Sequence, residues 1–200
     1  MSGAKHRCWW CGDDPLYVAY HDTEWGRATK DDRYLFEKIC LEGFQAGLSW
    51  ITVLRKRERF REVFDHFDIQ KVSRFTEKDV LRLLKDEGII RHRGKIESVI
   101  NNAACAIELK KEYGSLAAYF WGWVPDQKER PKTFDEKTVK STAQTLTSKA
   151  ISKDLKKRGW SFVGPTTIYS FMQAIGMVND HVEDCFCRKE AEKIRKSFTP

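Results

Sequence analysis

The sequence contains no long hydrophobic run, and this absence is the first feature that narrows its class. Its apolar stretches fall well short of the ~18 residues that suggest a membrane-spanning helix. The N-terminal residues MSGAKHR lack the apolar stretch of a secretory signal peptide. β-Branched residues form no alternating run, and neither an internal repeat nor a low-complexity tract occurs. The sequence therefore predicts one cytoplasmic domain over residues 1–200, with no association with a membrane.

Basic residues outnumber acidic ones, 36 to 29, and give a formal net charge of +7. They are concentrated in three segments, residues 55–61, 91–95 and 153–158. If these segments share one face, they would neutralise the phosphates of a nucleic acid. If they are ordinary solvated helix surfaces, they need no ligand. The sequence leaves both interpretations open.

Six cysteines occur in the chain, and four of them lie close to histidines in the sequence. Cys40 and Cys105 fall in apolar helical patterns, which favours buried free thiols over disulfides. A structural zinc ion needs four Cys or His ligands. Neither of the remaining groups supplies four ligands alone, but together they would do so and join the two ends of the chain. These groups are Cys8, Cys11 and His21 near the start, and His181, Cys185 and Cys187 near the end.

Apolar periodicity predicts an all-α fold. The stretch 124–147 is polar, contains two prolines and is predicted to be a linker. The clearest helix has one buried stripe formed by Leu35, Phe36, Ile39 and Cys40. The predicted helices cover residues 31–43, 50–64, 80–84, 95–109, 115–121, 148–158, 165–175 and 189–196.

Glu42 is the most informative single residue in the sequence. At 100° per residue it lies about 20° from Leu35 around the helix, at the border of the apolar stripe. A carboxylate at this position must be paired or must serve a pocket, because burying an unpaired charge is unfavourable. Gly43 and Gly47 leave space around it. An ion pair with an arginine is the alternative to a ligand pocket.

Aromatic residues crowd the first quarter of the chain. Beside a carboxylate, such rings would bind a flat cationic ligand through stacking and cation–π attraction. The alternative is that the rings are simply part of the hydrophobic core. The residues in question are Trp9, Trp10, Tyr17, Tyr20, Trp25 and Trp50.

A glycine-bounded turn lies between two predicted helices, at residues 159–164. Basic residues precede this turn, and the hydroxyls of Thr166 and Thr167 follow it. The N–H groups at the start of the second helix would then point outward and hold a phosphate without reading sequence. An ordinary turn between helices is equally compatible with this stretch.

Several long strings closely resemble the DNA-3-methyladenine glycosylase I family, within the helix-hairpin-helix DNA glycosylase superfamily. The resemblance covers about residues 7 to 187 and implies a two-lobed helical fold whose hairpin holds the DNA backbone. It also implies a monofunctional enzyme that flips 3-methyladenine out of double-stranded DNA and hydrolyses its glycosidic bond. The products would be free 3-methyladenine and an abasic site. The strings are Asp14–Asp22, Leu41–Leu54, Gly88–Ile96, Phe162–Thr166, Tyr169–Ala174 and Val178–His181.

The resemblance also implies roles for individual residues. Family spacing selects Cys8, His21, His181 and Cys185 as ligands of a structural Zn²⁺, whereas ligand chemistry alone favours Cys8 with Cys11. Cys11 and Cys187 are then spare or substitute ligands.

For the pocket, the resemblance implies that Glu42 contacts the methylated base. Phe44 replaces the glutamine that the family has at this position, and Asp180 receives no catalytic role. The base would be stacked by Tyr20 and Trp50, with Tyr17 and Trp10 nearby. The residues expected to contact DNA are Gln45, Leu48, Gly159, Gly164 and Thr166.

Two other classes of protein remain open from the sequence, and a monomer is expected in each case. A non-enzymatic, zinc-stabilised DNA-binding module would explain the basic segments and the hairpin. A zinc hydrolase would need an open metal position and would lose its activity on mild chelation.

Overall fold

The computed structural model describes residues 5–199, and helices and short helical turns are its regular elements. No strand occurs within this range, so the all-α prediction is confirmed. No helix in the described range is long and apolar enough to cross a membrane. The elements are η1 (Trp9–Cys11), α1 (Pro15–Thr23), α2 (Asp32–Gln45), α3 (Trp50–Arg55), α4 (Arg57–Val63), η2 (Asp65–Phe67), α5 (Ile69–Val72), α6 (Glu77–Leu84), α7 (Arg93–Tyr113), α8 (Leu116–Trp121), η3 (Gln127–Glu129), α9 (Glu136–Ser141), α10 (Leu146–Lys157), α11 (Pro165–Ala174) and α12 (Arg188–Ser197).

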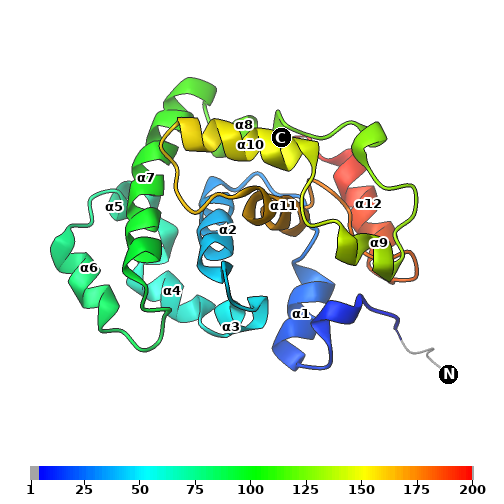
Figure 1. Cartoon of the computed structure of the whole chain (residues 1–200), viewed down its shortest axis with the longest axis horizontal. Coiled ribbons are helices and arrows are strands. Elements are labelled where there is room, and N and C mark those ends of the chain that lie inside the picture. Colours follow the sequence, from blue (N-terminus) through cyan, green and yellow to red (C-terminus); the bar gives the residue numbers. More distant parts are fainter. Residues whose placement is uncertain (1–4, 200) are drawn as a thin grey trace.

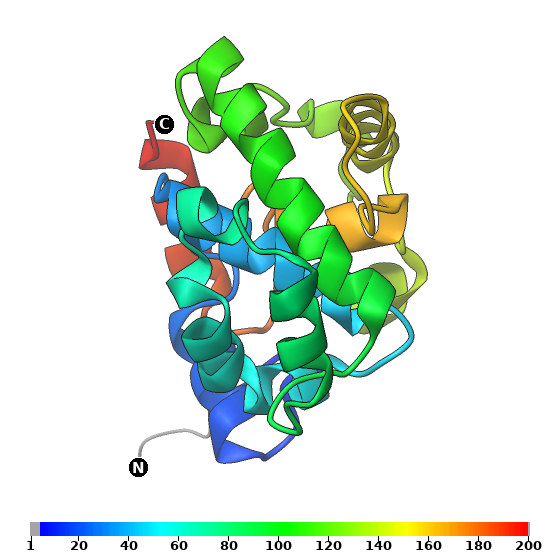
Figure 2. The same ribbon diagram turned by 90° about the vertical axis from the view of Figure 1, so that its left-hand side faces the viewer.

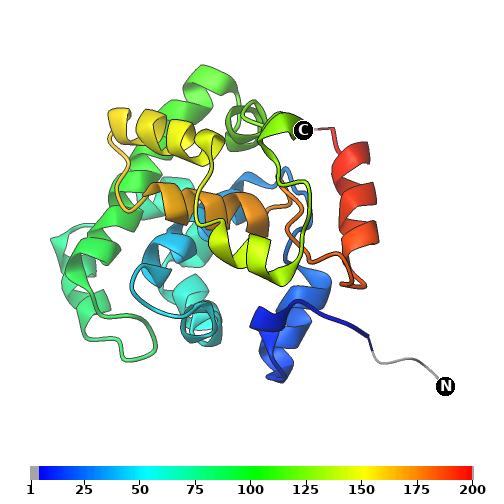
Figure 3. The same ribbon diagram turned by 45° about the vertical axis from the view of Figure 1, so that its right-hand side comes forward.

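Helix α2 lies in the middle of the molecule and packs against α3, α7, α8 and α11 (Figure 1). Helices α4 to α7 gather on one side of it, where α7 is the longest element (Figure 2). Helices α1, α9 and α12 lie on the other side, so the first and last helices share one side of the molecule (Figure 3).

The central position of α2 buries more of it than a single stripe. Every residue from Leu35 to Phe44 is buried, including Glu37, Lys38 and Glu42. The sequence predicted one buried apolar stripe, with the opposite face of the helix exposed to solvent. This part of the prediction is wrong. Neighbouring helices cover the remaining faces, so three charged side chains lie inside the protein.

Both ends of α2 are closed by polar side chains from defined positions. The Asp31 carboxylate accepts hydrogen bonds from the backbone N–H groups of Arg33 and Tyr34. At the other end, Lys95 Nζ donates to the carbonyl oxygens of Phe44 and Ala46, at 2.8 and 2.5 Å. Lys95 therefore fixes the point at which the chain leaves the helix and enters the exposed loop at residues 46–49.

Two predicted segments differ from the structure. The helix predicted over residues 50–64 is two helices, α3 and α4, which meet at Lys56. The predicted linker at 124–147 contains η3 and α9, and the side chain of Asp135 caps α9. The sequence analysis also missed α1, although Asp14 caps it and Pro15 occupies its first position.

The turn between α10 and α11 is anchored to the long helix α7. Asn101 donates from Nδ2 to the carbonyl oxygen of Gly159, and Asn102 forms two hydrogen bonds with the backbone of Ser161. Gly159 has φ of 88°, a left-handed conformation that glycine adopts without strain. The first half of the turn is thus held against α7, and Ser152 of α10 donates from Oγ to the carbonyl oxygen of Val163 near its end.

The three basic segments differ in the ion pairing and exposure of their side chains. The four arginines of segment 55–61 all form ion pairs, for example Arg59 with Glu62 and Asp86. In segment 91–95 both arginines are also paired, and Lys95 is buried. These two segments fit the interpretation as ordinary helix surface. Lys153, Lys156 and Lys157 are exposed on α10, directly before the turn.

Replacement of Lys95 by methionine is expected to lower the free energy of unfolding by about 1–3 kcal/mol, because two carbonyl oxygens at the end of α2 lose their donor. Urea unfolding followed by circular dichroism measures this change. Lys156→Met, on an exposed face, is the matched control and should shift stability by less than about 0.5 kcal/mol. Equal stability of the two variants would contradict the role of Lys95.

Candidate ligand pocket and metal centre

A pocket of about 330 Å³ opens between the N-terminal helices and the centre of the molecule. Its walls come from η1, α1, α2, α3, α9 and α11 and from residues next to them. It is lined by Trp9, Trp10, Tyr17, Tyr20, Trp25, Glu42, Gln45, Trp50, Val139, Lys140, Thr142, Ser170 and Gln173.

Aromatic rings form most of one side of this pocket. Tyr20 and Trp50 lie with ring centroids 5.4 Å apart. Trp10 contacts Tyr17 at 5.1 Å and Trp25 at 4.9 Å. The structure therefore brings together all four aromatic residues expected in the site, and adds Trp9 and Trp25 to its lining.

Glu42 lies at the pocket and is only 4% exposed. Within residues 5–199 no ion pair or hydrogen bond of its carboxylate is found, so the alternative of an arginine partner is not supported. Burial raises the pKa of Glu42 to about 7, and the positive charge of Lys38 opposes part of this rise. A carboxylate without a fixed partner is available for a ligand.

Lys38, one turn before Glu42 on α2, was missed by the sequence analysis. Its ammonium donates to the hydroxyl oxygen of Tyr20 at 3.1 Å and to Glu24 at 3.3 Å. Arg57 contacts both oxygens of Glu24 at 2.7 Å. The spacing of four residues places Lys38 and Glu42 on the same side of the helix, which is the signal that was available in the sequence.

The remaining polar lining comes from two elements that the sequence analysis did not place there. Val139, Lys140 and Thr142 belong to or follow α9, and nothing in the composition of the predicted linker indicated this position. Ser170 and Gln173 are three residues apart on α11 and therefore share one face of that helix.

Asp180 is buried at 3% exposure and is fully engaged in contacts with other side chains. Arg130 forms an ion pair with it, Tyr169 donates from its hydroxyl at 2.5 Å, and Gln173 donates from Nε2 at 2.7 Å. These contacts anchor Gln173 beside the pocket. The sequence interpretation that gave Asp180 no catalytic role stays a prediction.

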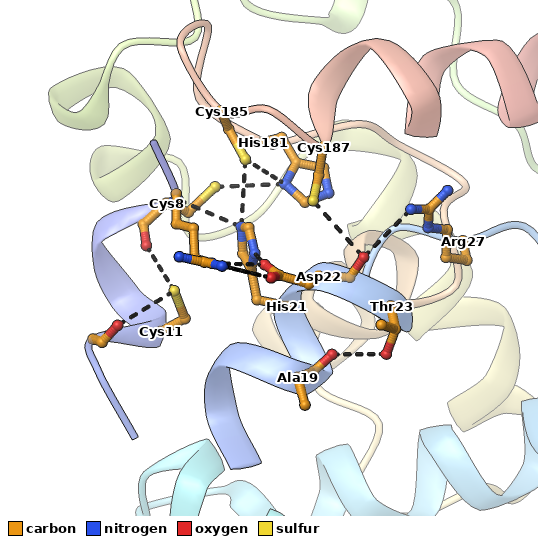
Figure 4. Close-up of polar contacts among 12 residues, drawn as sticks. Cys8, Cys11, Ala19, His21, Asp22, Thr23, Arg27, His181, Cys185 and Cys187 are labelled. Carbon is orange, nitrogen blue, oxygen red and sulfur yellow. Dashed lines mark hydrogen bonds and ion pairs between the residues drawn. The ribbon is translucent and has the colours of Figure 1, made fainter. Parts of the chain in front are cut away.

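Two segments far apart in the sequence meet in a buried cluster of two cysteines and two histidines (Figure 4). The ligand atoms of Cys8, His21, His181 and Cys185 all lie within 4.8 Å of one another. Cys185 Sγ lies 3.4 Å from His21 Nε2 and 3.3 Å from His181 Nδ1, and Cys8 Sγ lies 3.6 Å from His181 Nδ1.

These distances fit a tetrahedral metal ion. With Zn–S of about 2.3 Å and Zn–N of about 2.0 Å, tetrahedral angles place sulfur and nitrogen ligands about 3.5 Å apart. His21 contacts the Asp22 carboxylate through Nδ1 at 2.8 Å, which leaves Nε2 for a metal. The hydrogen bond between Cys8 and Cys185 lowers the pKa of Cys185 and raises that of Cys8, so the pair favours one thiolate in the absence of a metal.

Cys11 and Cys187 lie outside the group of four. Cys11 Sγ contacts the carbonyl oxygen of Cys8, and Cys187 Sγ contacts that of Asp22 (Figure 4). The interpretation based on family spacing therefore agrees with the geometry, and the preference for a Cys8–Cys11 pair does not. Cys187 still lies near His21 and Asp22 in a second, three-residue group.

The cysteine and histidine cluster also supports the aromatic side of the pocket. Trp10 lies 5.2 Å from His21, and Trp25 lies 4.7 Å from His181, both in edge-on arrangements. Gly26 follows directly, and a side chain on it would come within 3.1 Å of His181 Nε2. Trp10 therefore packs against His21, and Trp25 packs against His181.

The other expected site residues lie at the surface next to the pocket or on the α10–α11 turn. Gln45 lines the pocket at the end of α2, and Leu48 is 42% exposed in the following loop. Gly159 and Gly164 bound the turn, and Thr166 is exposed in the first turn of α11. Phe44 is buried against Phe60 at 4.4 Å and so faces the core.

Comparison with known proteins identifies the family of this chain. A family model described as methyladenine glycosylase matches residues 10–188. The chain belongs to this family. Among curated proteins, DNA-3-methyladenine glycosylase 1 of Escherichia coli (strain K12) is 51% identical to this glycosylase over 182 residues, which cover 90% of this chain and 96% of the relative.

Solved structures give the same result for the fold. A crystal structure of 3-methyladenine DNA glycosylase I is 50% identical with a TM-score of 0.86, and the match covers 92% of this glycosylase and 100% of that chain. A Staphylococcus aureus structure that describes 3-methyladenine recognition is 35% identical with a TM-score of 0.85, covering 93% and 98%.

Loss of one side chain from the Cys8, His21, His181 and Cys185 cluster is expected to abolish metal binding there and to lower the melting temperature by at least about 5 °C. Cys8→Ser and His181→Ala test this, because these side chains join segments at opposite ends of the chain. Metal content by mass spectrometry and thermal unfolding are the two measurements. Cys187→Ser is the control and should retain the metal; a full metal content in Cys8→Ser would contradict the assignment.

Glu42 is expected to make stability fall as pH rises. Its pKa is 4.5 in the absence of burial and about 7 in the folded protein, so the folded state binds the proton more tightly. Between these values the free energy of unfolding should decrease by up to about 3 kcal/mol. Glu42→Gln should remove this decrease, as measured by urea unfolding at pH 5 and pH 8. In Glu37→Gln, whose carboxylate is paired with Arg61 in the parent, the decrease should persist.

Proposed function

We propose that the protein is a monofunctional glycosylase that removes 3-methyladenine from alkylated double-stranded DNA and leaves an abasic site. The observation that carries the proposal is a buried carboxylate without a partner at an aromatic pocket, in a chain of the methyladenine glycosylase family. The pocket volume of about 330 Å³ is sufficient for a purine base.

Recognition in this proposal rests on the positive charge of the damaged base. Methylation at N3 makes the adenine ring cationic, and a cation stacks well on electron-rich rings. Tyr20 and Trp50 provide these rings, and Glu42 provides the opposite charge. Because Glu42 is desolvated, its interaction with a bound cation is stronger than it would be in water.

The reaction needs little acid catalysis. As the bond between the sugar and the base breaks, its electron pair moves into the cationic ring, so the base leaves as a neutral molecule. Water adds to C1′ of the sugar and releases its proton to solvent. The enzyme must extrude the nucleotide, which costs a few kcal/mol in unstacking, and must then hold the base in the pocket.

We assign DNA binding to two segments, the α10–α11 turn and the end of α2 with the loop that follows it. The α10–α11 turn with Gly159, Gly164 and Thr166 would bind the backbone in the manner of a helix-hairpin-helix motif, and the exposed lysines of α10 precede it. Gln45 and Leu48 would enter the space that the extruded nucleotide leaves, since Leu48 is an exposed apolar side chain in the loop that follows Gln45.

For the cluster of Cys8, His21, His181 and Cys185 we propose a structural Zn²⁺. When bound, the ion would supply folding stability by joining the two ends of the described chain and would leave no open position for water. No step of the proposed reaction uses it. The chain itself supports the rings of Trp10 and Trp25 on the two histidines.

The second candidate, a non-enzymatic DNA-binding module, explains the α10–α11 turn and its lysines. It leaves the unpartnered Glu42 and the pocket without a role. Incubation of methylated DNA with the protein, followed by chromatography of released bases, distinguishes the two. Tight binding of methylated DNA without release of 3-methyladenine would favour the module.

Glu42→Ala is expected to lower kcat/KM for 3-methyladenine release by about 10- to 100-fold, because the bound cation loses a charged hydrogen-bond partner. It should also weaken binding of free 3-methyladenine, while the circular dichroism spectrum stays unchanged. Glu108→Gln, an exposed carboxylate on α7, is the matched control and should release base at the parent rate. An undiminished rate in Glu42→Ala would remove this residue from the mechanism.

A further inference from the structure

A second pocket, of about 210 Å³, lies between α12 and the stretch of chain that leads into α9 (Figure 3). The proposed reaction uses none of its residues. Helix α12 begins where the residues matched by the family model end, at position 188. Three arginines but only one carboxylate line this second pocket, namely Arg130, Arg188, Arg195 and Glu192.

Two of these arginines share one aromatic ring. The guanidinium carbon of Arg188 lies 4.0 Å from the ring centroid of Phe134, and that of Arg130 lies 5.6 Å from it. The backbone of Phe134 is fixed by Glu183, whose carboxylate accepts from its N–H at 2.9 Å and whose N–H donates to its carbonyl oxygen at 3.2 Å. The fold therefore holds two positive charges near each other, which is unfavourable unless both are compensated.

Only one of the two charges has a carboxylate partner. Arg130 forms an ion pair with the buried Asp180. Arg188 is half-buried, and its guanidinium donates to the carbonyl oxygen of His181. Within residues 5–199 no ion pair of Arg188 is found. Because a guanidinium group has five N–H donors, Arg188 keeps donors for a further partner.

The one carboxylate in the lining does not supply that partner. Glu192 lies one turn after Arg188 on α12, at a spacing that would allow an ion pair. It is instead bound by Arg195 at 2.7 Å and by Asn179 Nδ2 at 3.2 Å. The positive charge of Arg188 is therefore left for a ligand that enters the pocket.

We propose that this second pocket binds a phosphate group, which Arg188 holds through its planar fork while Arg130 adds positive charge. The two parallel N–H groups of arginine match the oxygens of a phosphate. A phosphate offers more oxygens and more negative charge than a carboxylate, so it can compensate two neighbouring guanidinium groups at once. The volume of about 210 Å³ is sufficient for such a group. The phosphate belongs either to a small molecule or to the backbone of DNA.

The test is titration calorimetry with inorganic phosphate at constant ionic strength. Arg188→Met is expected to bind phosphate at least about tenfold more weakly than the parent, because a charged donor pair is lost. Arg188→Lys keeps the charge and a donor for the carbonyl oxygen of His181, but it lacks the fork and should show a smaller loss. Lys189→Met removes the same charge from an exposed neighbour on α12 and should bind phosphate like the parent.

Two further measurements locate the site and identify the source of the phosphate. Lys156→Met, before the α10–α11 turn, should leave the phosphate affinity unchanged, since the proposed site lies elsewhere. Binding of undamaged duplex DNA is then measured over a range of salt concentrations. A salt dependence that is weaker by about one phosphate contact in Arg188→Met would assign the site to the DNA backbone, and an unchanged dependence would assign it to a small phosphate ester.

Any of three results would overturn the inference. The parent could give neither heat of binding nor a rise in melting temperature with phosphate. Arg188→Met and Arg188→Lys could both bind phosphate as tightly as the parent. Lys189→Met or Lys156→Met could lose as much affinity as Arg188→Met, which would indicate diffuse charge or the α10–α11 turn. If Arg188→Met does not fold, Arg188→Lys decides. Release of 3-methyladenine tests the proposed function separately, since phosphate binding does not depend on it.

Discussion

The burial of the Glu42 carboxylate without a partner is the constraint on which the site depends. An ionised carboxylate in this position is unfavourable, and the pKa of about 7 expresses that fact. The surrounding helices leave a pocket there instead of a compensating arginine. The rings of Tyr20 and Trp50 line the same pocket, and the ammonium of Lys38 lies 4.5 and 4.6 Å from their centroids.

The cluster of cysteines and histidines also restricts the positions of the aromatic rings that line the pocket. Trp10 and Trp25 rest on His21 and His181, and Trp10 also contacts Tyr17. The position of these rings therefore depends on contact between segments that are more than 150 residues apart in the sequence. Joining the chain near its ends is thus also a means of holding the aromatic side of the pocket in place.

Local patterns predicted much of the fold and part of the site. Apolar periodicity located α2, α7 and α11, because helical burial repeats along the chain. The unusual position of Glu42 and the crowding of aromatic residues indicated a pocket for a cation. The contributions of Lys38, Gln173 and α9 could not be predicted, since they depend on which helices cover α2 and on where the polar stretch at 124–147 crosses the molecule. Burial of α2 on all sides is likewise a property of the tertiary fold.

Charge balance offers a physical basis for distinguishing damaged from undamaged adenine. Lys38 and Arg57 oppose Glu24 and Glu42, so the ionised group is neutral as a whole. With its raised pKa, Glu42 is partly protonated near neutral pH. Under the proposed function, a cationic base would lower that pKa again and gain a full ion pair, whereas neutral adenine would have to bind beside a desolvated charge or a protonated acid. The proposed discrimination would follow from the burial of Glu42, because an exposed carboxylate would be screened by water and would favour the two bases almost equally.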